Sequence, residues 1–324
     1  MVEERAALRE AVRGLLGSAG PDAGLWARLC KEIGVAGLIV PEAYGGAGAT
    51  LAEAAIVLEE LGRVLSPAPM LGTLLAVEAL LRSGDEEARR RLLPAVCAGE
   101  RVVTVAWDGS GNVTDGLVSG VFPDVFAAGT VLVTVDGALH EVEIEAEVTA
   151  TLDVTRQVGT LRLDAVPGRR LNGPAPVLRD LACAALAAEQ VGTAERALEL
   201  TVAHVKDRHQ FGRPIGSFQV LQHRLAEAYI RVQAARSASE SAVEALVSGS
   251  PEAGRLAAVA KITCSETLRA VAAEMVQMHG GIAITWEHDA HRYLRRAWAS
   301  ARLYGSPDMH VARLTPTVLV DFSH

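Results

Sequence analysis

The order of helical and extended stretches constrains the fold of this chain more than any other feature. Over residues 1–99, apolar side chains recur at steps of three and four, the spacing of helices that bury one face. Helices are expected there at Glu3–Leu16, Ala23–Ile33, Thr50–Leu65, Leu71–Gly84 and Glu86–Ala98. The glycine-rich run Pro41–Gly48 is expected to be a turn that connects the second helix to the third.

From Arg101 onward the sequence changes to β-branched runs interrupted by Gly, Asp and Asn, which is typical of short strands joined by turns. Strands are expected at Val102–Trp107, Gly120–Phe122, Val131–Val135, Glu141–Glu145, Val148–Leu152 and Gly159–Leu163. This stretch therefore predicts an antiparallel all-β unit.

A second helical region follows the run Gly173-Pro174-Ala175-Pro176. Its helices are expected at Leu178–His204, from Ser217 onward, and at Ala234–Leu246, Glu252–His279 and Trp286–Arg302. Together they would close an antiparallel four-helix bundle. The chain is therefore predicted to be α+β and mainly α, with an N-terminal helical domain at 1–100, a reduced middle β-domain at 101–172 and a C-terminal helical bundle domain at 173–324.

Composition supports a helical protein that does not bind nucleic acid. Half of the 324 residues are hydrophobic but only 4% are aromatic, so Ala, Leu and Val must fill most of the core. The formal net charge of -8 argues against a nucleic-acid partner, which would require a clustered basic surface. The short basic runs Arg89-Arg90-Arg91 and Arg295-Arg296 are expected to be solvated helix faces.

Membrane and metal chemistry are not expected. No apolar run reaches eighteen residues, so no membrane span is predicted, and the start lacks the order of a secretory signal. The cysteines, all far apart in sequence, are expected to be buried thiols in a reduced cytoplasm: Cys30, Cys97, Cys183 and Cys264. His279, His288 and His291 are close in sequence, but no acidic or thiol ligand completes a metal set.

The segment Asp207–Ile230 combines a loop with the start of a helix. Gly212, Pro214 and Gly216 interrupt any helix, and Ser217 is a candidate N-cap. An apolar stripe follows, made by Phe218, Leu221, Leu225, Ala228 and Val232. A helix that only packs into a core would not need three kinds of side chain found here. They are the five-donor guanidinium of Arg208, the flat ring of Phe211, and the amides of Gln219 and Gln222.

This segment resembles the R-x-Q-F-G-x-P-I-x-x-F-Q-x-x-Q motif of acyl-CoA dehydrogenases. Two earlier runs are similar to the same family: Pro41–Gly48 to its P-E-x-Y-G-G-x-G loop, and Glu59–Arg63 to its E-E-L-G-R motif. Both earlier runs are interpreted as architectural. The order of helices, sheet and helices is also that of the acyl-CoA dehydrogenase fold.

The run Gln277–Thr285 is similar to a further family motif, Q-x-x-G-G-x-G-x-x-x-E, although Ala283 stands where the family usually has its last glycine. Adjacent glycines at a helix end leave N–H groups open to a diphosphate, although they also make an ordinary helix C-cap. In the family, these segments reach FAD that is bound mainly by a neighbouring subunit. The resemblance implies cofactor contacts by Arg208, Phe211, Gln219, Gln277, Gly280 and Gly281.

Acyl-CoA dehydrogenases desaturate a CoA thioester, with a carboxylate as the base that removes the α-proton. The two positions where the family places this base are held by Tyr304 and Ala182, neither of which is a carboxylate. Asp180, Glu189 and Asp308 are the nearest carboxylates, and a register slip could bring one in. No residue is therefore assigned as catalytic.

The middle region also departs from the family pattern. Ala106–Asn112 stands where family members carry a T-E-P-x-x-G-S-D segment, and no W-I-T strand follows. Parts of the flavin cradle are therefore expected to be missing. The missing base and reduced cradle, beside intact flavin-contact segments, resemble the non-catalytic β-type subunit of a heteromeric actinobacterial acyl-CoA dehydrogenase.

This resemblance implies an α2β2 flavoprotein in lipid metabolism, with FAD as cofactor and a catalytic partner subunit that provides the base and the acyl-CoA pocket. Steroid side-chain CoA esters are a possible substrate class, and an electron-transferring flavoprotein is the usual acceptor in the family. Two alternatives stay open. The chain could be a self-sufficient homo-oligomeric enzyme that uses Asp308 or Asp180 as base, or a cofactor-free structural scaffold.

Overall fold

The computed structural model describes residues 2–18, 24–144 and 151–321 and is mainly α-helical with one larger sheet. It divides into two compact units. Unit 1 comprises Met1–Val57, Pro67–Thr151 and Arg156–Ala182, and unit 2 comprises Leu58–Ser66, Leu152–Thr155 and Cys183–His324. The predicted division into three domains stays a prediction.

The predicted N-terminal helices are present as α1 (Val2–Ser18), α2 (Leu25–Arg28) continuing as the π-turn Leu29–Ile33, α3 (Leu51–Arg63), α4 (Met70–Ser83) and α5 (Glu86–Cys97). Ala23, the expected start of the second helix, lies outside the described residues. Local capping explains two starts. The Thr50 hydroxyl and the Glu53 carboxylate form a reciprocal capping box before α3, and Asp85 accepts a hydrogen bond from the Ala88 N–H at 2.8 Å before α5.

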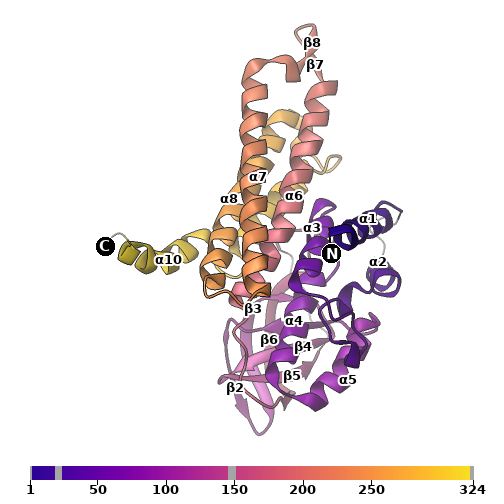
Figure 1. Cartoon of the computed structure of the whole chain (residues 1–324), viewed down its shortest axis with the longest axis vertical. Coiled ribbons are helices and arrows are strands. Elements are labelled where there is room, and N and C mark those ends of the chain that lie inside the picture. Colours follow the sequence, from indigo (N-terminus) through magenta and orange to yellow (C-terminus); the bar gives the residue numbers. More distant parts are fainter. Residues whose placement is uncertain (1, 19–23, 145–150, 322–324) are drawn as a thin grey trace. The chain divides into compact units, whose positions relative to one another are not determined.

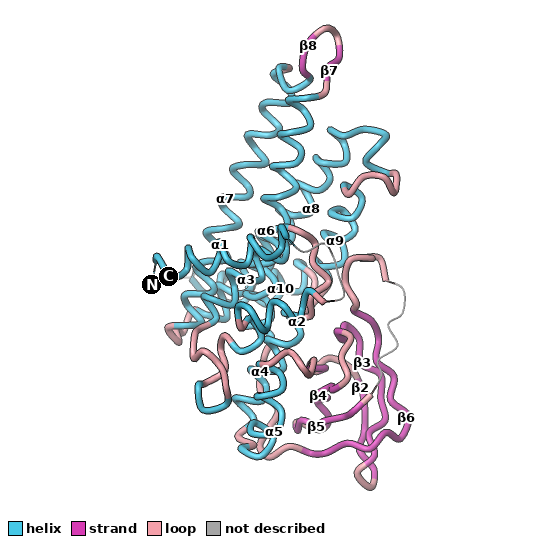
Figure 2. Tube along the Cα trace, turned by 90° about the vertical axis from the view of Figure 1, so that its right-hand side faces the viewer, coloured by secondary structure: helices cyan, strands magenta, loops and turns pink. Residues whose placement is uncertain are grey.

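The larger sheet of unit 1 has the strand order β1-β4-β5-β6-β3-β2. Its strands, drawn in magenta in Figure 2, are β1 (Val103–Ala106), β2 (Ser110–Thr114), β3 (Leu117–Phe126), β4 (Thr130–Val135), β5 (Ala138–Glu143) and β6 (Val158–Arg170). Strand β6 pairs with β5 through its last residues and with β3 through the rest of its length, and irregular register along β3 bends the pair.

One expectation for this sheet was wrong, and one of its strands was missed. Strand β1 pairs in parallel with β4, so the sheet is not purely antiparallel. Strand β2 had not been expected, because its residues Ser110–Thr114 are polar and largely exposed, so no apolar alternation marks them. Residues 145–150, on which most of the expected strand Val148–Leu152 falls, lie outside the described residues, and Leu152 itself is not in a strand.

Unit 2 is built on long helices that Figure 1 shows side by side: α6 (Arg179–Asp207, whose first residues belong to unit 1), α7 (Gln219–Val247) and α8 (Ala253–His279). After α8 come a 3-10 turn, Gly280–Ile284, then α9 (Ala290–Arg302) and α10 (Pro307–Asp321). Small residues such as Ala194, Ala197 and Ala272 fill the core of the bundle. This agrees with the aromatic-poor composition.

Three details of this region differ from the predictions. The expected separate helix Ala234–Leu246 is the second half of α7, which runs without a break. Ser217 does not cap α7, because Phe218 holds the N-cap position and the Ser217 hydroxyl donates to the Pro214 carbonyl at 2.7 Å. Helix α10 follows Ser306 and had not been expected.

Candidate functional site

The hairpin that joins α6 to α7 presents an aromatic ring to solvent. Its strands β7 (His209–Gln210) and β8 (Arg213–Pro214) pair with each other, and Figure 1 shows the hairpin at the far end of the two helices. Phe211 and Gly212 form the turn with φ angles of 52° and 77°. Phe211 is 91% exposed, and the centroid of its ring lies 6.0 Å from that of Phe218 in a T-shaped arrangement. A left-handed backbone conformation costs free energy for a phenylalanine. At Phe211 this conformation turns the ring toward solvent.

Polar side chains with unused donors surround this hairpin. Arg208 and Gln219 are both exposed, and among the described residues Arg208 pairs with no carboxylate. Gln222 differs, because its amide donates to the Gly216 carbonyl at 3.1 Å and so braces the loop. Arg208 and Gln219 can therefore donate to an acceptor outside the chain, while Gln222 shapes the loop.

The second predicted segment lies at the end of α8. Gly280 has φ 68° and ψ -143°, a conformation open in practice only to glycine, and it ends the helix. An added Cβ at Gly280 or at Gly281 would meet no atom within 4 Å, so both backbones face open space. Gln277 is exposed one turn earlier. The glycine pair is therefore a helix end and also a bare, accessible stretch of backbone.

A histidine cluster brings the two segments to the same end of unit 2. The His204 ring, one turn before Arg208, stacks on the His279 ring at 4.1 Å between centroids, and His288 lies 4.5 Å from His279. The His279 Nδ1–H donates to the Met275 carbonyl at 2.7 Å. Burial is the main cause that lowers the pKa values of His204 and His279, and for His279 it outweighs the hydrogen bond to Met275, which acts in the opposite direction. Both rings therefore favour the neutral form more than a free histidine does.

The two predicted base positions contain no carboxylate that could act there. Tyr304 is buried with φ 61°, and the ring Nε2 of His310 lies 3.0 Å from the Tyr304 carbonyl oxygen. The same nitrogen lies 3.7 Å from the Cys183 sulfur, a pairing that the sequence did not indicate because the two residues are 127 positions apart. Ala182 is fully buried.

The carboxylates considered as replacements occupy different environments. Asp308 is exposed on the first turn of α10, and Asp180 is half-buried on the first turn of α6. Glu189 is buried and accepts a hydrogen bond from the Arg296 guanidinium at 3.0 Å. Glu189 therefore neutralises a buried cation and is not available as a base.

Arg296 corrects the expectation that Arg295-Arg296 is a solvated pair. Its side chain is 1% exposed and its Nε lies 2.5 Å from the Asp153 carboxylate. The remaining donors reach Glu189, the Thr155 hydroxyl, and the carbonyls of Leu65 and Ser66. One guanidinium thus joins three segments of unit 2 that are distant in sequence. Its helical neighbours gave no sign of burial, because the carboxylate partners come from elsewhere in the chain.

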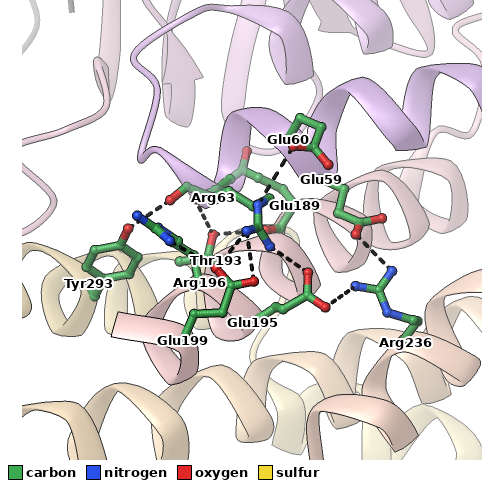
Figure 3. A network of polar contacts seen from close by, with 11 residues as sticks. Glu59, Glu60, Arg63, Glu189, Thr193, Glu195, Arg196, Glu199, Arg236 and Tyr293 are labelled. Carbon is green, nitrogen blue, oxygen red and sulfur yellow. Dashed lines mark hydrogen bonds and ion pairs between the residues drawn. The ribbon is translucent and has the colours of Figure 1, made fainter. Parts of the chain in front are cut away.

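A second ion network, shown in Figure 3, surrounds the run Glu59–Arg63. Arg63 contacts Glu195 at 2.6 Å and Glu199 at 2.7 Å, and Arg236 contacts Glu59 at 2.8 Å and Glu195 at 3.1 Å. These pairs join α3 to α6 and α7 inside unit 2. They support the interpretation of this motif as architectural.

Two family models match the chain. The model for the acyl-CoA dehydrogenase N-terminal domain matches residues 3–100, and the model for the acyl-CoA dehydrogenase C-terminal domain matches residues 181–318. The chain belongs to the acyl-CoA dehydrogenase family. This confirms the resemblance read from the Arg208–Gln222 and Gln277–Thr285 segments, and the mainly α fold class with it.

Relatives and solved structures agree over nearly the whole chain. Acyl-CoA dehydrogenase IpdE2 of Mycobacterium tuberculosis is 41% identical over 331 residues, which cover 98% of each chain. A chain of the Tcur3481-Tcur3483 steroid ACAD G363A variant superposes with a TM-score of 0.89 at 32% identity, over 99% of both chains. A chain of the ChsE4-ChsE5 complex from Mycobacterium tuberculosis superposes with a TM-score of 0.88 at 27% identity, over 97% of both.

The residues at the hairpin end of unit 2 fit one side of the family's cofactor, FAD. Arg208 could pair with diphosphate oxygens, and the open backbone at Gly280 and Gly281 suits close approach of the same group. The exposed Phe211 ring suits contact with a flat aromatic group. All of these groups are exposed in this chain. They could hold a cofactor whose other side is bound by a different chain.

The described residues contain neither a metal-ligand cluster nor a helix suited to span a membrane. No group of three or more His, Cys, Asp or Glu side chains within them is arranged to hold a metal ion. No helix among them is both long and apolar enough to cross a membrane.

Proposed function

We propose that this chain is the non-catalytic subunit of a heteromeric, FAD-dependent acyl-CoA dehydrogenase. The observation that carries the proposal is the absence of a carboxylate at both base positions, where the buried residues Tyr304 and Ala182 stand. Tyrosine has an ordinary pKa of about 10, so it is a poor base for an α-proton. The α-proton is then removed by a carboxylate of the partner chain.

In this proposal the chain contributes binding contacts and the partner contributes the chemistry. When bound, FAD accepts the hydride that leaves the substrate β-carbon. Arg208 pairs with the diphosphate, and the exposed backbone at Gly280 and Gly281 donates to it. Phe211, Gln219 and Gln277 contact the cofactor from the same end of unit 2. An electron-transferring flavoprotein would be the acceptor, as is usual in the family.

The similar solved structures support a two-chain enzyme and suggest its substrate class. One of them is called a complex of two chains and another a steroid ACAD. We therefore propose an α2β2 assembly that acts on a CoA thioester with a steroid-derived acyl group.

The visible absorption spectrum tests the subunit role directly. The chain is purified alone and after co-expression with the acyl-CoA dehydrogenase-like chain encoded nearest to it. A colourless lone chain and a yellow complex are expected, because each flavin site needs contacts from both chains. A yellow, active lone chain would contradict the proposal and favour the homo-oligomeric enzyme.

Two sets of variants separate the alternatives. In the complex, Asp308→Asn and Asp180→Asn should keep turnover, because neither residue acts as base; loss of turnover with either would identify a base in this chain. Arg208→Ala should lower the flavin content of the assembled complex. An unchanged flavin content would favour the cofactor-free scaffold.

A further inference from the structure

Two tryptophans of unit 2 are unusually exposed for their size. Trp286 is 66% exposed and Trp298 is 47% exposed, whereas the other tryptophans, Trp26 and Trp107, are partly buried. Large exposed aromatic side chains are enriched at protein–protein interfaces, where they supply a large contact area at a small entropic cost. The positions of Trp286 and Trp298 therefore mark a candidate contact surface.

Arginines hold both rings in place. The guanidinium of Arg269 on α8 lies 4.0 Å from the centroid of the Trp298 ring, and that of Arg295 lies 5.2 Å from the centroid of Trp286. The edge of His291 packs against Trp286 at 4.6 Å. Arg295 and Trp298 are three residues apart on α9, so the two Arg–Trp pairs are neighbours on one face of that helix. This set, Trp286, Arg295, Trp298 and Arg269, is called the ladder below.

The ladder is cationic although the whole chain is acidic. Arg269 is paired with Glu266 at 2.7 Å, but among the described residues neither Arg295 nor the exposed Arg302, one turn beyond Trp298, pairs with a carboxylate. The chain as a whole carries a formal net charge of -8. A surface with two aromatic rings and unpaired guanidinium groups suits an acidic or aromatic partner surface.

The ladder is continuous with the segment that is proposed to contact the cofactor. Gly281 leads through Ile282 and Ile284, which are 45% and 76% exposed, to Trp286. If the glycines face a flavin bound by another chain, the apolar residues that follow them face that chain too. We propose that the ladder docks the catalytic partner subunit, which offers it an acidic and aromatic surface; this inference rests on the proposed heteromeric function.

A second copy of this chain fits the ladder less well than an unlike partner. A two-fold contact brings the same patch of both copies together, so the cationic ladder of one copy would share an interface with the cationic ladder of the other. Like charges brought together at an interface are unfavourable and exclude wrong partners. The ladder therefore favours the unlike partner over self-association, which is the selectivity that a heteromeric enzyme needs.

Binding measurements with ladder variants test the proposal. The probe is the acyl-CoA dehydrogenase-like chain encoded nearest to this one, and the dissociation constant of the heteromer is measured for Trp286→Ala, Trp298→Ala and Arg295→Glu. Each tryptophan variant should raise the dissociation constant by at least about tenfold, as truncation of an interface anchor does. The Arg295→Glu variant should slow association most at low salt. The control is Val177→Ala, which shortens a side chain that is 81% exposed outside the ladder.

Hydroxyl-radical footprinting of the wild-type proteins tests the proposal even if a variant fails to fold. Hydroxyl-radical oxidation of Trp286 and Trp298 should fall when the wild-type heteromer forms. Unchanged oxidation of the tryptophans overturns the ladder proposal, as do ladder variants with the same dissociation constant as Val177→Ala. In either case a yellow wild-type heteromer would still support the subunit role. Absence of any wild-type heteromer removes both proposals. Ladder variants that instead disperse a homo-oligomer would assign the surface to a second copy.

Discussion

Arg296 shows how much a single buried charge can matter in this bundle. Its guanidinium neutralises the carboxylates of Asp153 and Glu189, which are 3% and 6% exposed. Replacement by methionine would leave two buried carboxylates without their cation, a kind of change that costs about 3–5 kcal/mol. We expect Arg296→Met to lower the free energy of unfolding by that amount, measured by urea denaturation of the purified chain.

Arg292 provides the matched control one turn earlier on α9. It contacts Asp289 at 3.1 Å, but the side chains are 42% and 63% exposed, and such pairs contribute about 0–1 kcal/mol. Arg292→Gln should therefore change stability little. If both variants lowered the free energy of unfolding equally little, water or a local rearrangement would have to stabilise the carboxylates around Arg296. The structural role given to Arg296 would then be wrong.

His279 should make unit 2 sensitive to acid. Burial lowers its pKa below the ordinary value of about 6.5 that applies in the unfolded chain, and this effect outweighs the hydrogen bond to Met275, which raises the pKa. The unfolded state then binds a proton first, so the stabilisation is complete above about pH 6.5 and is lost as the pH falls toward the lowered pKa of the folded state.

Substitution should remove part of this acid sensitivity. His279→Asn keeps an N–H donor for the Met275 carbonyl but cannot titrate, so its melting temperature should fall less between pH 7.5 and pH 5.5 than that of the wild-type chain. His209→Asn, at an exposed position on the hairpin, is the control. Equal acid sensitivity of the His279 variant and the wild type would show that the histidine cluster does not govern the pH response.

Single residues also show where sequence reasoning ends. The sequence indicated Arg208, Phe211, Gly280 and Gly281 because they lie in contiguous motifs, and all of them are exposed at one end of unit 2. It missed the burial of Arg296, because burial depends on partners that are more than 100 residues away. The spacing of apolar residues in the sequence predicts which residues share a face of a helix. Which other segments cover that face is known only from the folded structure.

At the scale of elements, two glycines allow α3 and α6 to approach closely. A Cβ on Gly192 would lie 1.9 Å from the Glu59 carbonyl oxygen, and a Cβ on Gly62 would lie 2.2 Å from the Glu189 carbonyl oxygen. Both clashes are with backbone, which cannot rotate away. Helix α3 is therefore held against α6 by the absence of side chains as well as by the ion network of Arg63.

Alanine substitution tests this helix crossing. Gly192→Ala should destabilise the chain by about 1–3 kcal/mol, the range for overpacking a well-packed core. Gly14→Ala, inside α1 with no atom within 4 Å of the new Cβ, should instead stabilise it by about 0.5–1 kcal/mol. Thermal melts of the two variants check both signs. A stabilised Gly192 variant would show that the helices can separate at no cost.

Helices were easier to predict than strands for a physical reason. A helix of more than ten residues repeats its apolar period several times, so α1, α4, α5 and α6 were found within a few residues of their ends. A short exposed strand such as β2 buries nothing of its own and is defined by its pairing with β3. The parallel pairing of β1 with β4 likewise depends on how the chain returns to the sheet, which a local pattern does not contain.

For the whole molecule, the proposed function fixes how many flavins an assembly should hold. Under that proposal this chain offers only exposed contacts to the flavin, so each flavin requires the cradle of one partner chain. The heteromer should therefore contain about one flavin for each pair made of one chain of this protein and one partner chain, which is one for every two chains. A homo-oligomeric enzyme would contain one flavin for every chain.

The stoichiometry can be measured from the flavin absorbance of the denatured complex together with the amounts of the two chains. Phe211→Ala should lower the flavin content without dispersing the complex, because the ring is 91% exposed and packs only loosely within its own chain. Val177→Ala, exposed outside the hairpin, should leave the flavin content unchanged. One flavin for every chain would mean that this chain has a complete site of its own, and the search for its base would return to Asp308 and Asp180.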